Sequence, residues 1–367
     1  MIKIKKNILF VIIALLTVSC FQKKENDNNV FTIYIESKNI LNTIKLSELI
    51  SDYKYLPLET TSECLIGRLD KVEIFENDIF TLDMWNSKSV YRFSSEGKFL
   101  NRIANRGKGP GEYIEPNDIS VNTNSAEITI LDRNNKQVLI YKPDNIYLRN
   151  IKLPVYAYKL AWYDNNIATY SDREEDLVLL DGRGKQIGAF FNNEYARKMV
   201  MEYPFQSYKE KELLYWANFD YTIYNISGKK VTTHLKFVFD KRMFKDNDIQ
   251  LLKSDEKNRN NFVRIKYYSE NSSHVYMVYF FNNAPYMVIY NKLNLKTTIV
   301  DVRGIQNDIT FTREPPLIMG VTPDNNFISY FDYYDVSKPE ELKKIIGTPA
   351  DDLNEMSNPI LLFLKFK

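Results

Sequence analysis

The stretch RGKGPGEYIEPNDISVNTNSAEITILD, residues 106–132, decides the fold. It opens with three glycines and a proline within five residues (107–111), which is typical of a tight loop. Alternating apolar residues follow at 119 and 121, then at 128 and 130, and the run stops at Asp132. Such alternation predicts two half-buried strands joined by a polar turn. A glycine loop that leads into a strand hairpin indicates the place where one small sheet follows another.

A strand-turn-strand signature recurs along the chain. Residues 93–100 (FSSEGKFL) align position for position with residues 141–148 (YKPDNIYL). Residues 180–187 and 224–231 fit the same frame, and residues 290–294 (YNKLN) continue it. The fifth place is Gly or Asn in every copy, where a hairpin turn favours a positive φ. The spacings of 48, 39, 44 and 66 residues scatter around the period of four-stranded propeller blades, about 40–50 residues.

The repeat predicts an all-β fold, a six-bladed β-propeller of four-stranded antiparallel blades. Five blades are complete between residues 71 and 300, and the sixth lacks one strand. Residues 52–59 (DYKYLPLE) are expected to supply it by pairing with residues 360–366, so that both ends of the chain close the ring. Two insertions, residues 240–261 and 333–358, are predicted to be surface segments with helical turns.

The composition agrees with this fold and narrows the function. There are 26 Tyr and 22 Phe against 12 Gly, which favours strands over helices. The formal net charge is only +2 and no basic stripe is present, which argues against nucleic-acid binding. No sequence motif implies a cofactor, so none is expected.

The first 19 residues are predicted to be a lipoprotein signal peptide. Three lysines precede an apolar core, residues 8–18, that is too short to span a bilayer. The sequence Leu16-Thr-Val-Ser-Cys20 resembles the lipobox of bacterial lipoproteins, which implies lipidation at Cys20 and a membrane partner. The alternative is an ordinary secretory signal with a chance cysteine. Residues 20–44 are expected to form a tether and N-terminal extension, and residues 45–367 the propeller.

The motifs also resemble a known family. GKGPGEY (107–113), followed by PNDISV, ITILD and QVLIY, is similar to the six-bladed β-propeller lipoproteins of gut-dwelling Gram-negative bacteria and, more distantly, to NHL repeats. The resemblance covers about residues 45–367, and the second repeat is the clearest match. It implies a propeller in the cell envelope, with the outer membrane as the expected location, and it implies no particular activity.

One face of the ring is the expected binding face. In a four-stranded blade, the loop between the second and third strands leaves the same side as the crossover to the next blade, and long loops on a rigid scaffold often carry function. This rule groups the candidate ligand-binding residues Trp85, Arg106, Lys108, Glu112 and Arg133. The glycine loop has two interpretations: an anion-binding nest, or a structural crossover in which Glu112 pairs locally.

Signals for catalysis are sparse. His234 and His274 are the only histidines, and the pattern places them badly for a metal site or a catalytic triad, so no metal is expected. Cys64 is expected to be buried, Trp216 to be in the core, and Trp162 is a possible stacking platform for a sugar. Asp83 and Asp132 each end a second strand, where a turn-capping role is favoured.

Two functions therefore stay open. The first is a binding or scaffold module for a glycan, a peptide or an envelope partner. The second is a hydrolase or lyase acting on polysaccharide, with carboxylates such as Asp118, Glu112, Asp172 and Glu174 or with tyrosines at the channel mouth. A funnel with convergent Asp, Glu, Arg and Tyr would favour chemistry there, and a plugged channel would not.

Overall fold

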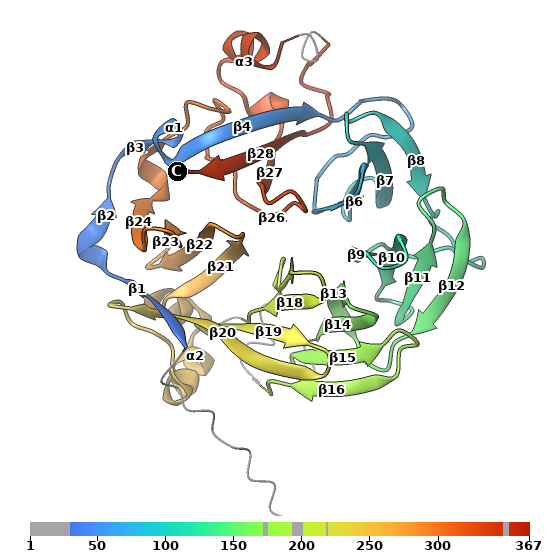
Figure 1. Ribbon diagram of the computed structural model, residues 1–367, viewed down its shortest axis with the longest axis horizontal. Helices are drawn as coiled ribbons and strands as arrows, with labels where there is room; N and C mark the ends of the chain where they lie inside the picture. The colour runs from blue at the N-terminus through green and yellow to red at the C-terminus, as the bar shows by residue number, and fades with distance from the viewer. Residues whose placement is uncertain (1–29, 172–174, 193–200, 218, 348–351) are drawn as a thin grey trace, which may run out of the picture. The chain divides into compact units, whose positions relative to one another are not determined.

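The computed structural model describes residues 30–171, 175–192, 201–217, 219–347 and 352–367. From Phe31 to Lys367, six small sheets are arranged in a ring, and the strands of each sheet lie side by side in order from the centre of the ring outwards (Figure 1). The predicted six-bladed β-propeller is therefore confirmed. Among the described residues, no helix has the length and apolar character needed to cross a membrane.

The first three blades are four-stranded antiparallel meanders, as the repeat predicts. Their strands, listed from the centre outwards, are β5 (Lys71–Phe75), β6 (Asp78–Asp83), β7 (Ser89–Ser94) and β8 (Phe99–Ile103) in blade 1; β9 (Asp118–Asn122), β10 (Glu127–Asp132), β11 (Gln137–Tyr141) and β12 (Tyr147–Lys152) in blade 2; and β13 (Ala157–Tyr163), β14 (Asn166–Ser171), β15 (Leu177–Asp181) and β16 (Gln186–Phe190) in blade 3.

Blades 4 and 5 each carry a fifth strand at the outer edge. Their antiparallel strands are β17 (Phe205–Tyr208), β18 (Glu212–Tyr215), β19 (Thr222–Ser227) and β20 (Lys230–Phe239) in blade 4, and β21 (Arg264–Glu270), β22 (His274–Phe281), β23 (Ala284–Asn291) and β24 (Lys296–Asp301) in blade 5. Strand β1 (Phe31–Ile35) pairs in parallel with β20, and β2 (Ile40–Leu41) pairs in parallel with β24.

These added strands correct the sequence prediction. Residues 31–41, which we expected in an N-terminal extension outside the propeller, are part of it. The reason is tertiary packing: Ile33 and Ile35 alternate along β1 and are 2% and 1% exposed, while the backbone of β1 pairs with an outer strand whose edge would otherwise be open. The chain then forms β3 (Ile44–Lys45), which pairs with β25 (Ile305–Gln306), and helix α1 (Leu46–Leu49).

Blade 6 closes the ring with both ends of the chain. It consists of β26 (Gly320–Val321), β27 (Phe327–Phe331), β28 (Ile360–Phe366) and β4 (Ile50–Pro57). Strands β28 and β4 pair antiparallel, with Ile360 opposite Pro57 and Phe366 opposite Ile50, which confirms the predicted closure. The inner strand β26 is only two residues long, and the Met319 N–H just before it donates to the Ile328 carbonyl at 2.9 Å.

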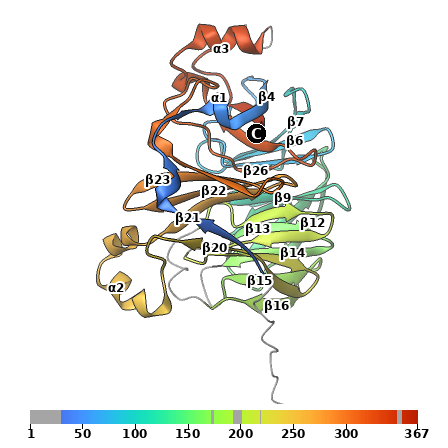
Figure 2. The ribbon, with the colours of Figure 1, turned by 60° about the vertical axis from the view of Figure 1, so that its left-hand side comes forward.

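Both insertions contain helices, as predicted. Helix α2 (Ile249–Ser254) lies in the first and α3 (Pro339–Ile346) in the second, and both project from the sheets in Figure 2. Helix α3 begins with Pro339 at its first turn and ends at Gly347, whose φ is 79°. Short 3-10 turns occupy Ser37–Asn39, Asp246–Asp248, Glu256–Asn261, Val302–Gly304 and Tyr333–Asp335.

The core lies between neighbouring blades, where large aromatic side chains fill the gaps between sheets. Trp216 is 1% exposed and Cys64 is fully buried, both as predicted. Trp162 is also buried, at 6% exposure, and its indole N–H donates to the Thr129 hydroxyl at 2.7 Å. Trp162 is therefore a core residue, and the prediction of a sugar-stacking platform at this position is wrong.

Candidate functional site

The loops of blades 1 and 2 meet on one face, as the strand order predicts. Lys88, in the loop after β6, forms an ion pair with Glu115 at 2.6 Å, and its carbonyl accepts from the Tyr113 hydroxyl at 3.1 Å. The Ile114 N–H donates to Asp132 at the end of β10 at 3.3 Å. These contacts join the glycine loop to both neighbouring loops, and we call this side of the ring the loop-rich face.

The five candidate residues occupy different environments on that face. Trp85 is 59% exposed and Lys108 is exposed, whereas the Arg106 Nε donates to the Ile114 carbonyl at 3.2 Å. Arg133 is half-buried, with its guanidinium carbon 4.8 Å from the ring centre of Tyr158.

Glu112 folds back onto its own loop. Its carboxylate accepts the Gly109 N–H at 2.7 Å and covers Gly107 so closely that a methyl group there would overlap it. The anion bound by this loop is therefore the loop's own glutamate.

Two aspartates hold the loops in shape, as predicted for turn caps. The buried Asp83 carboxylate accepts five backbone N–H groups, from residues 67, 68, 85, 86 and 87, at 2.8–3.3 Å. Asp132 accepts from the Ile114 N–H and from the side chains of Asn135 and Gln137. Both carboxylates are fully buried, so neither is exposed to a ligand.

A pocket of about 520 Å³ opens on the loop-rich face where the inner strands converge. We call it the channel-mouth pocket. Its walls come from the segments before β5, β17 and β26, from β21, and from the end of β27, and so from blades 1, 4, 5 and 6. The polar and aromatic side chains that line it are Arg68, Glu202, Tyr203, Tyr267, Thr312, Arg313, Glu314, Tyr330, Phe331, Asp332 and Asp335. None of the five residues predicted from the sequence is among its lining residues.

Hydrogen bonds and ion pairs fix part of this lining. The Tyr203 hydroxyl donates to the Asp70 carbonyl at 3.0 Å, which links the segments that lead into blades 4 and 1. The Arg68 Nε lies 2.9 Å from the Asp70 carboxylate, and Lys266 lies 3.3 Å from Glu202. Burial, followed by the charge of Asp332, raises the pKa of Tyr330 to about 12, so this phenol is a neutral hydrogen-bond donor at physiological pH.

Asp332 differs from the two capping aspartates although it stands in a similar place in its blade. It directly follows the second strand β27, as Asp83 and Asp132 end β6 and β10. Within the described part of the chain, no hydrogen bond or ion pair holds its half-buried carboxylate. Burial and, secondarily, the charge of Asp335 raise its pKa to about 6. The pocket therefore contains a carboxylate that is not used by the fold.

A buried ion cluster lies on the inner strands of blades 1 to 3. Lys71 contacts Asp118 at 3.1 Å and Glu73 at 3.2 Å, and Asp118 also accepts the Leu160 N–H at 2.8 Å. Burial lowers the pKa of Lys159, which is 8% exposed and lies within the electrostatic influence of Asp118. Asp118 thus joins inner strands rather than lining the pocket. Asp172 and Glu174 lie outside the described residues.

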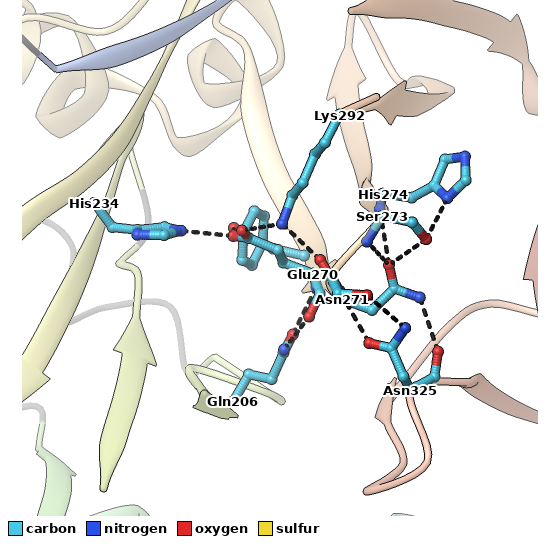
Figure 3. Close-up of polar contacts among 10 residues, drawn as sticks. Gln206, His234, Glu270, Asn271, Ser273, His274, Lys292 and Asn325 are labelled. Carbon is cyan, nitrogen blue, oxygen red and sulfur yellow. Dashed lines mark hydrogen bonds and ion pairs between the residues drawn. The ribbon is translucent and has the colours of Figure 1, made fainter. Parts of the chain in front are cut away.

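A second polar network joins blades 4 and 5 on the opposite face (Figure 3). The Glu270 carboxylate, 3% exposed, contacts His234 at 2.8 Å and Lys292 at 2.5 Å, and also accepts from the Tyr268 hydroxyl. The Gln206 amide bonds to both the N–H and the carbonyl of Glu270. The Lys292 ammonium also donates to the Asn271 carbonyl at 2.6 Å, and these contacts tie His234 of blade 4 to blade 5, so the network is an interblade clamp.

The second histidine belongs to a neighbouring turn. His274 Nδ1 contacts the Ser273 hydroxyl at 2.9 Å, and its Nε2 lies 2.9 Å from the main-chain oxygen of Lys367. The histidine ring thus links the turn before β22 to the residue that follows β28. Among the described residues, no group of three or more His, Cys, Asp or Glu side chains could hold a metal ion.

Comparison with known proteins places the chain in a family. Residues 30–365 match the domain of unknown function DUF4934. The chain belongs to the DUF4934 family. A comparison of this DUF4934 protein with curated sequences gave no match.

Two solved structures share its fold. A presumed exported protein of Bacteroides fragilis is 20% identical, with a TM-score of 0.76 over 92% of this chain and 99% of that chain. A member of the DUF4221 family from Bacteroides vulgatus is 12% identical, with a TM-score of 0.51 over 87% of this chain and 97% of that chain.

The residues that the sequence analysis missed had only weak signals. Arg68, Glu202 and Tyr203 lie in segments that lead into inner strands, and such segments look like ordinary connections in the sequence. Asp332 had a usable signal. It follows a second strand, like the capping aspartates, but the connection from it to the third strand β28 is long. That connection has 27 residues, 333–359, where blades 1 and 2 have a short loop.

Proposed function

We propose that this DUF4934 protein is a lipid-anchored protein of the cell envelope whose propeller binds a glycan in the channel-mouth pocket. The observation that carries the proposal is the lining of this cavity. Three tyrosines offer flat apolar faces, and arginines and carboxylates offer directional hydrogen bonds. The cavity of about 520 Å³ is within the usual range for small-ligand sites, about 300–1,000 Å³. Sugars need both kinds of contact, because their rings have apolar faces and their edges carry hydroxyl groups.

The location in the envelope is supported by two separate observations. The lipobox-like sequence ends at Cys20, and a structural neighbour is a presumed exported protein. Replacing Cys20 with Ser should release the protein from the membrane fraction or leave its signal uncleaved. Unchanged membrane attachment of a processed Cys20→Ser protein would rule out the anchor. An outer-membrane location and a kinship with NHL repeats belong to the same proposal.

A binding screen with a matched pair of variants tests the pocket. The full chain is screened on a glycan array, and Tyr267→Ala is compared with Trp85→Ala for any glycan that binds. Both aromatic side chains lie towards the loop-rich face, but only Tyr267 lines the pocket. We expect Tyr267→Ala to weaken binding at least about tenfold, equivalent to about 1.4 kcal/mol, and Trp85→Ala to leave it unchanged.

The reverse result would assign binding to the loop surface that the sequence analysis selected. Arg106→Ala combined with Arg133→Ala would then be the next variant, since both guanidinium groups lie on that surface. Peptides and envelope proteins are tested on the same pair of variants if no glycan binds. Equal effects of Tyr267→Ala and Trp85→Ala on every ligand would refute the pocket as the site.

A second candidate function, a polysaccharide hydrolase or lyase, is favoured by Asp332. A pKa of about 6 suits a general acid near neutral pH, and Asp332 faces a pocket that also contains tyrosines and other carboxylates. The pocket is thus the convergent kind of site that we expected of an enzyme. The test is release of reducing ends or unsaturated products from the glycans that bind. Asp332→Asn should abolish such turnover and leave binding in place, whereas turnover that survives the substitution would exclude this role.

A further inference from the structure

The hairpin turn at residues 292–295 of blade 5 exposes two leucines that the fold does not use. Leu293 is 83% exposed and Leu295 is 67% exposed. The turn is held by its asparagines: Asn291 accepts the N–H groups of residues 293 and 294, and Asn294 accepts that of Lys296. The leucine side chains therefore contribute nothing to the turn, and they leave apolar surface exposed to water, which is unfavourable.

The backbone makes Leu295 more unusual. It has a φ of 59°, in the left-handed region that disfavours bulky side chains. The corresponding turns of blades 1 to 4 have their positive φ at Gly97, Asn145, Gly184 and Gly228. The sequence alignment assigned this position to Asn294 in blade 5, and the structure shifts it by one residue. A leucine where Gly or Asn would be easier indicates that the apolar side chain serves something outside the fold.

The N-terminal segment joins the ring close to this turn. The Phe31 ring packs edge-on against Tyr290 at 5.6 Å, and Tyr290 lies in β23, which leads directly into the turn. Ten residues separate Cys20 from Phe31. An extended chain of that length spans at most about 40 Å. If Cys20 carries the lipid, the membrane is within that reach of the point where the segment meets the propeller.

The charges near the turn also suit a lipid surface. Lys296 follows the turn, and Lys229 and Lys230 form the matching turn of blade 4; all three are exposed. Basic residues next to an anchored segment are attracted by anionic headgroups. The turn joins a third to a fourth strand, so it lies on the side opposite the loop-rich face. The loop-rich face, where the pocket lies, has the unpaired carboxylate of Asp332, which an anionic lipid surface would repel.

We propose that Leu293 and Leu295 insert into the interface of the membrane that anchors the chain, and hold the propeller with its pocket directed away from the lipid. This inference rests on the lipid anchor of the proposed function. It adds a second attachment point, which fixes the orientation that attachment at a single residue leaves free.

The test uses the full lipidated chain, purified in detergent and reconstituted with vesicles of phosphatidylcholine and phosphatidylglycerol. Leu293→Cys carries an environment-sensitive fluorophore. Cys64 is fully buried and Cys20 is the acylated residue, so the label has one site. The matched control is Met356→Cys, 79% exposed, in the insertion that follows β27. We expect a blue-shifted emission and loss of fluorescence with nitroxide-bearing lipids at position 293, and neither change at position 356.

The outcomes separate the inference from the proposal beneath it. Protein that sediments with vesicles but shows no quenching at position 293 would overturn the inference and leave the anchor intact. Protein that does not sediment with vesicles would overturn both. In a third measurement, Leu293→Asn with Leu295→Asn should fold normally, because Asn tolerates a positive φ. In that background, a label at Lys296→Cys should lose the quenching that it shows beside the native leucines; retained quenching would contradict a role for the leucines.

Discussion

Replacing Asp332 with Asn should stabilise the protein at neutral pH, which is the reverse of the usual effect of changing a half-buried residue. The pKa of Asp332 is raised to about 6 by burial and by Asp335, and within the described chain no donor compensates its charge. The folded protein therefore binds a proton at this carboxyl more tightly than the unfolded chain does. The ionised carboxylate costs stability wherever the unfolded chain would already be ionised.

The magnitude follows from the shift. A rise from 3.8 to about 6 corresponds to an upper limit of about 3 kcal/mol in the free energy of unfolding. Because the Asp332 side chain is only half-buried, solvent screening reduces this to about 1 kcal/mol. The cost is absent below the ordinary carboxyl pKa, grows as the pH rises towards 6, and is complete above it. Asp332→Asn should therefore gain about 1 kcal/mol at about pH 7.5 and almost nothing at about pH 4.

Asp83→Asn is the matched control, since Asp83 occupies a similar place in blade 1. An asparagine has one acceptor oxygen, so at least two of the five N–H bonds are lost, which should cost about 2–4 kcal/mol. Urea denaturation of the three proteins at both pH values measures these differences. Asp83→Asn should lose stability at neutral pH. If Asp332→Asn lost stability in the same way, Asp332 would be another turn cap, and its carboxylate would be used by the fold and not be free in the pocket.

Three further outcomes follow from the contacts of the fold. Leu362→Ala, in the strand that closes the ring, should lower the free energy of unfolding by about 2–5 kcal/mol because the side chain is fully buried. Lys365→Ala, in the same strand, is the control and should change the free energy of unfolding by less than about 0.5 kcal/mol. Similar urea midpoints for the two variants would refute closure through this strand. Gly107→Ala should cost about 1–3 kcal/mol because its methyl group overlaps Glu112, and distinctly less in a Glu112→Ala background; a double-mutant cycle without coupling would contradict this. Glu270→Gln should cost about 3 kcal/mol at neutral pH, since it leaves the half-buried Lys292 ammonium without its anionic partner. Burial alone would raise the pKa of Glu270, but its histidine and lysine partners lower this pKa overall. The stability that the Glu270 carboxylate contributes is therefore present above the ordinary glutamate pKa and is lost as the pH falls below that value. If the destabilisation caused by Glu270→Gln were the same at every pH, that would argue against the clamp.

Much of the fold could be predicted because its signals are local. Short apolar runs, alternating in some strands and continuous in others, mark the strands, and Gly97, Asn145, Gly184 and Gly228 all adopt the positive φ that the turn pattern requires. Closure by residues 360–366 could be predicted by elimination, since one blade lacked a strand. The parallel strand β1 could not, because its partner β20 is about 200 residues away and only tertiary packing selects that edge.

The candidate site was predictable only in part. Loop geometry correctly grouped the loops of blades 1 and 2 on one face, because strand direction alternates regularly within a blade. It selected Glu112 on that face, whose carboxylate is used inside its own loop. It could not select Tyr267, which looks like any other aromatic residue of a strand until the ring brings it beside Glu202.

The amino-acid sequence by itself therefore determined the blades, their turns and the ring, because these depend on residue alternation and on backbone preferences within a few residues. The tertiary structure decided which polar groups are left for a ligand. Asp83 and Asp332 follow the same strand pattern, yet one is covered by five N–H groups and the other opens into a pocket. That difference depends on which distant segments surround each carboxylate, and no local pattern in the chain records it.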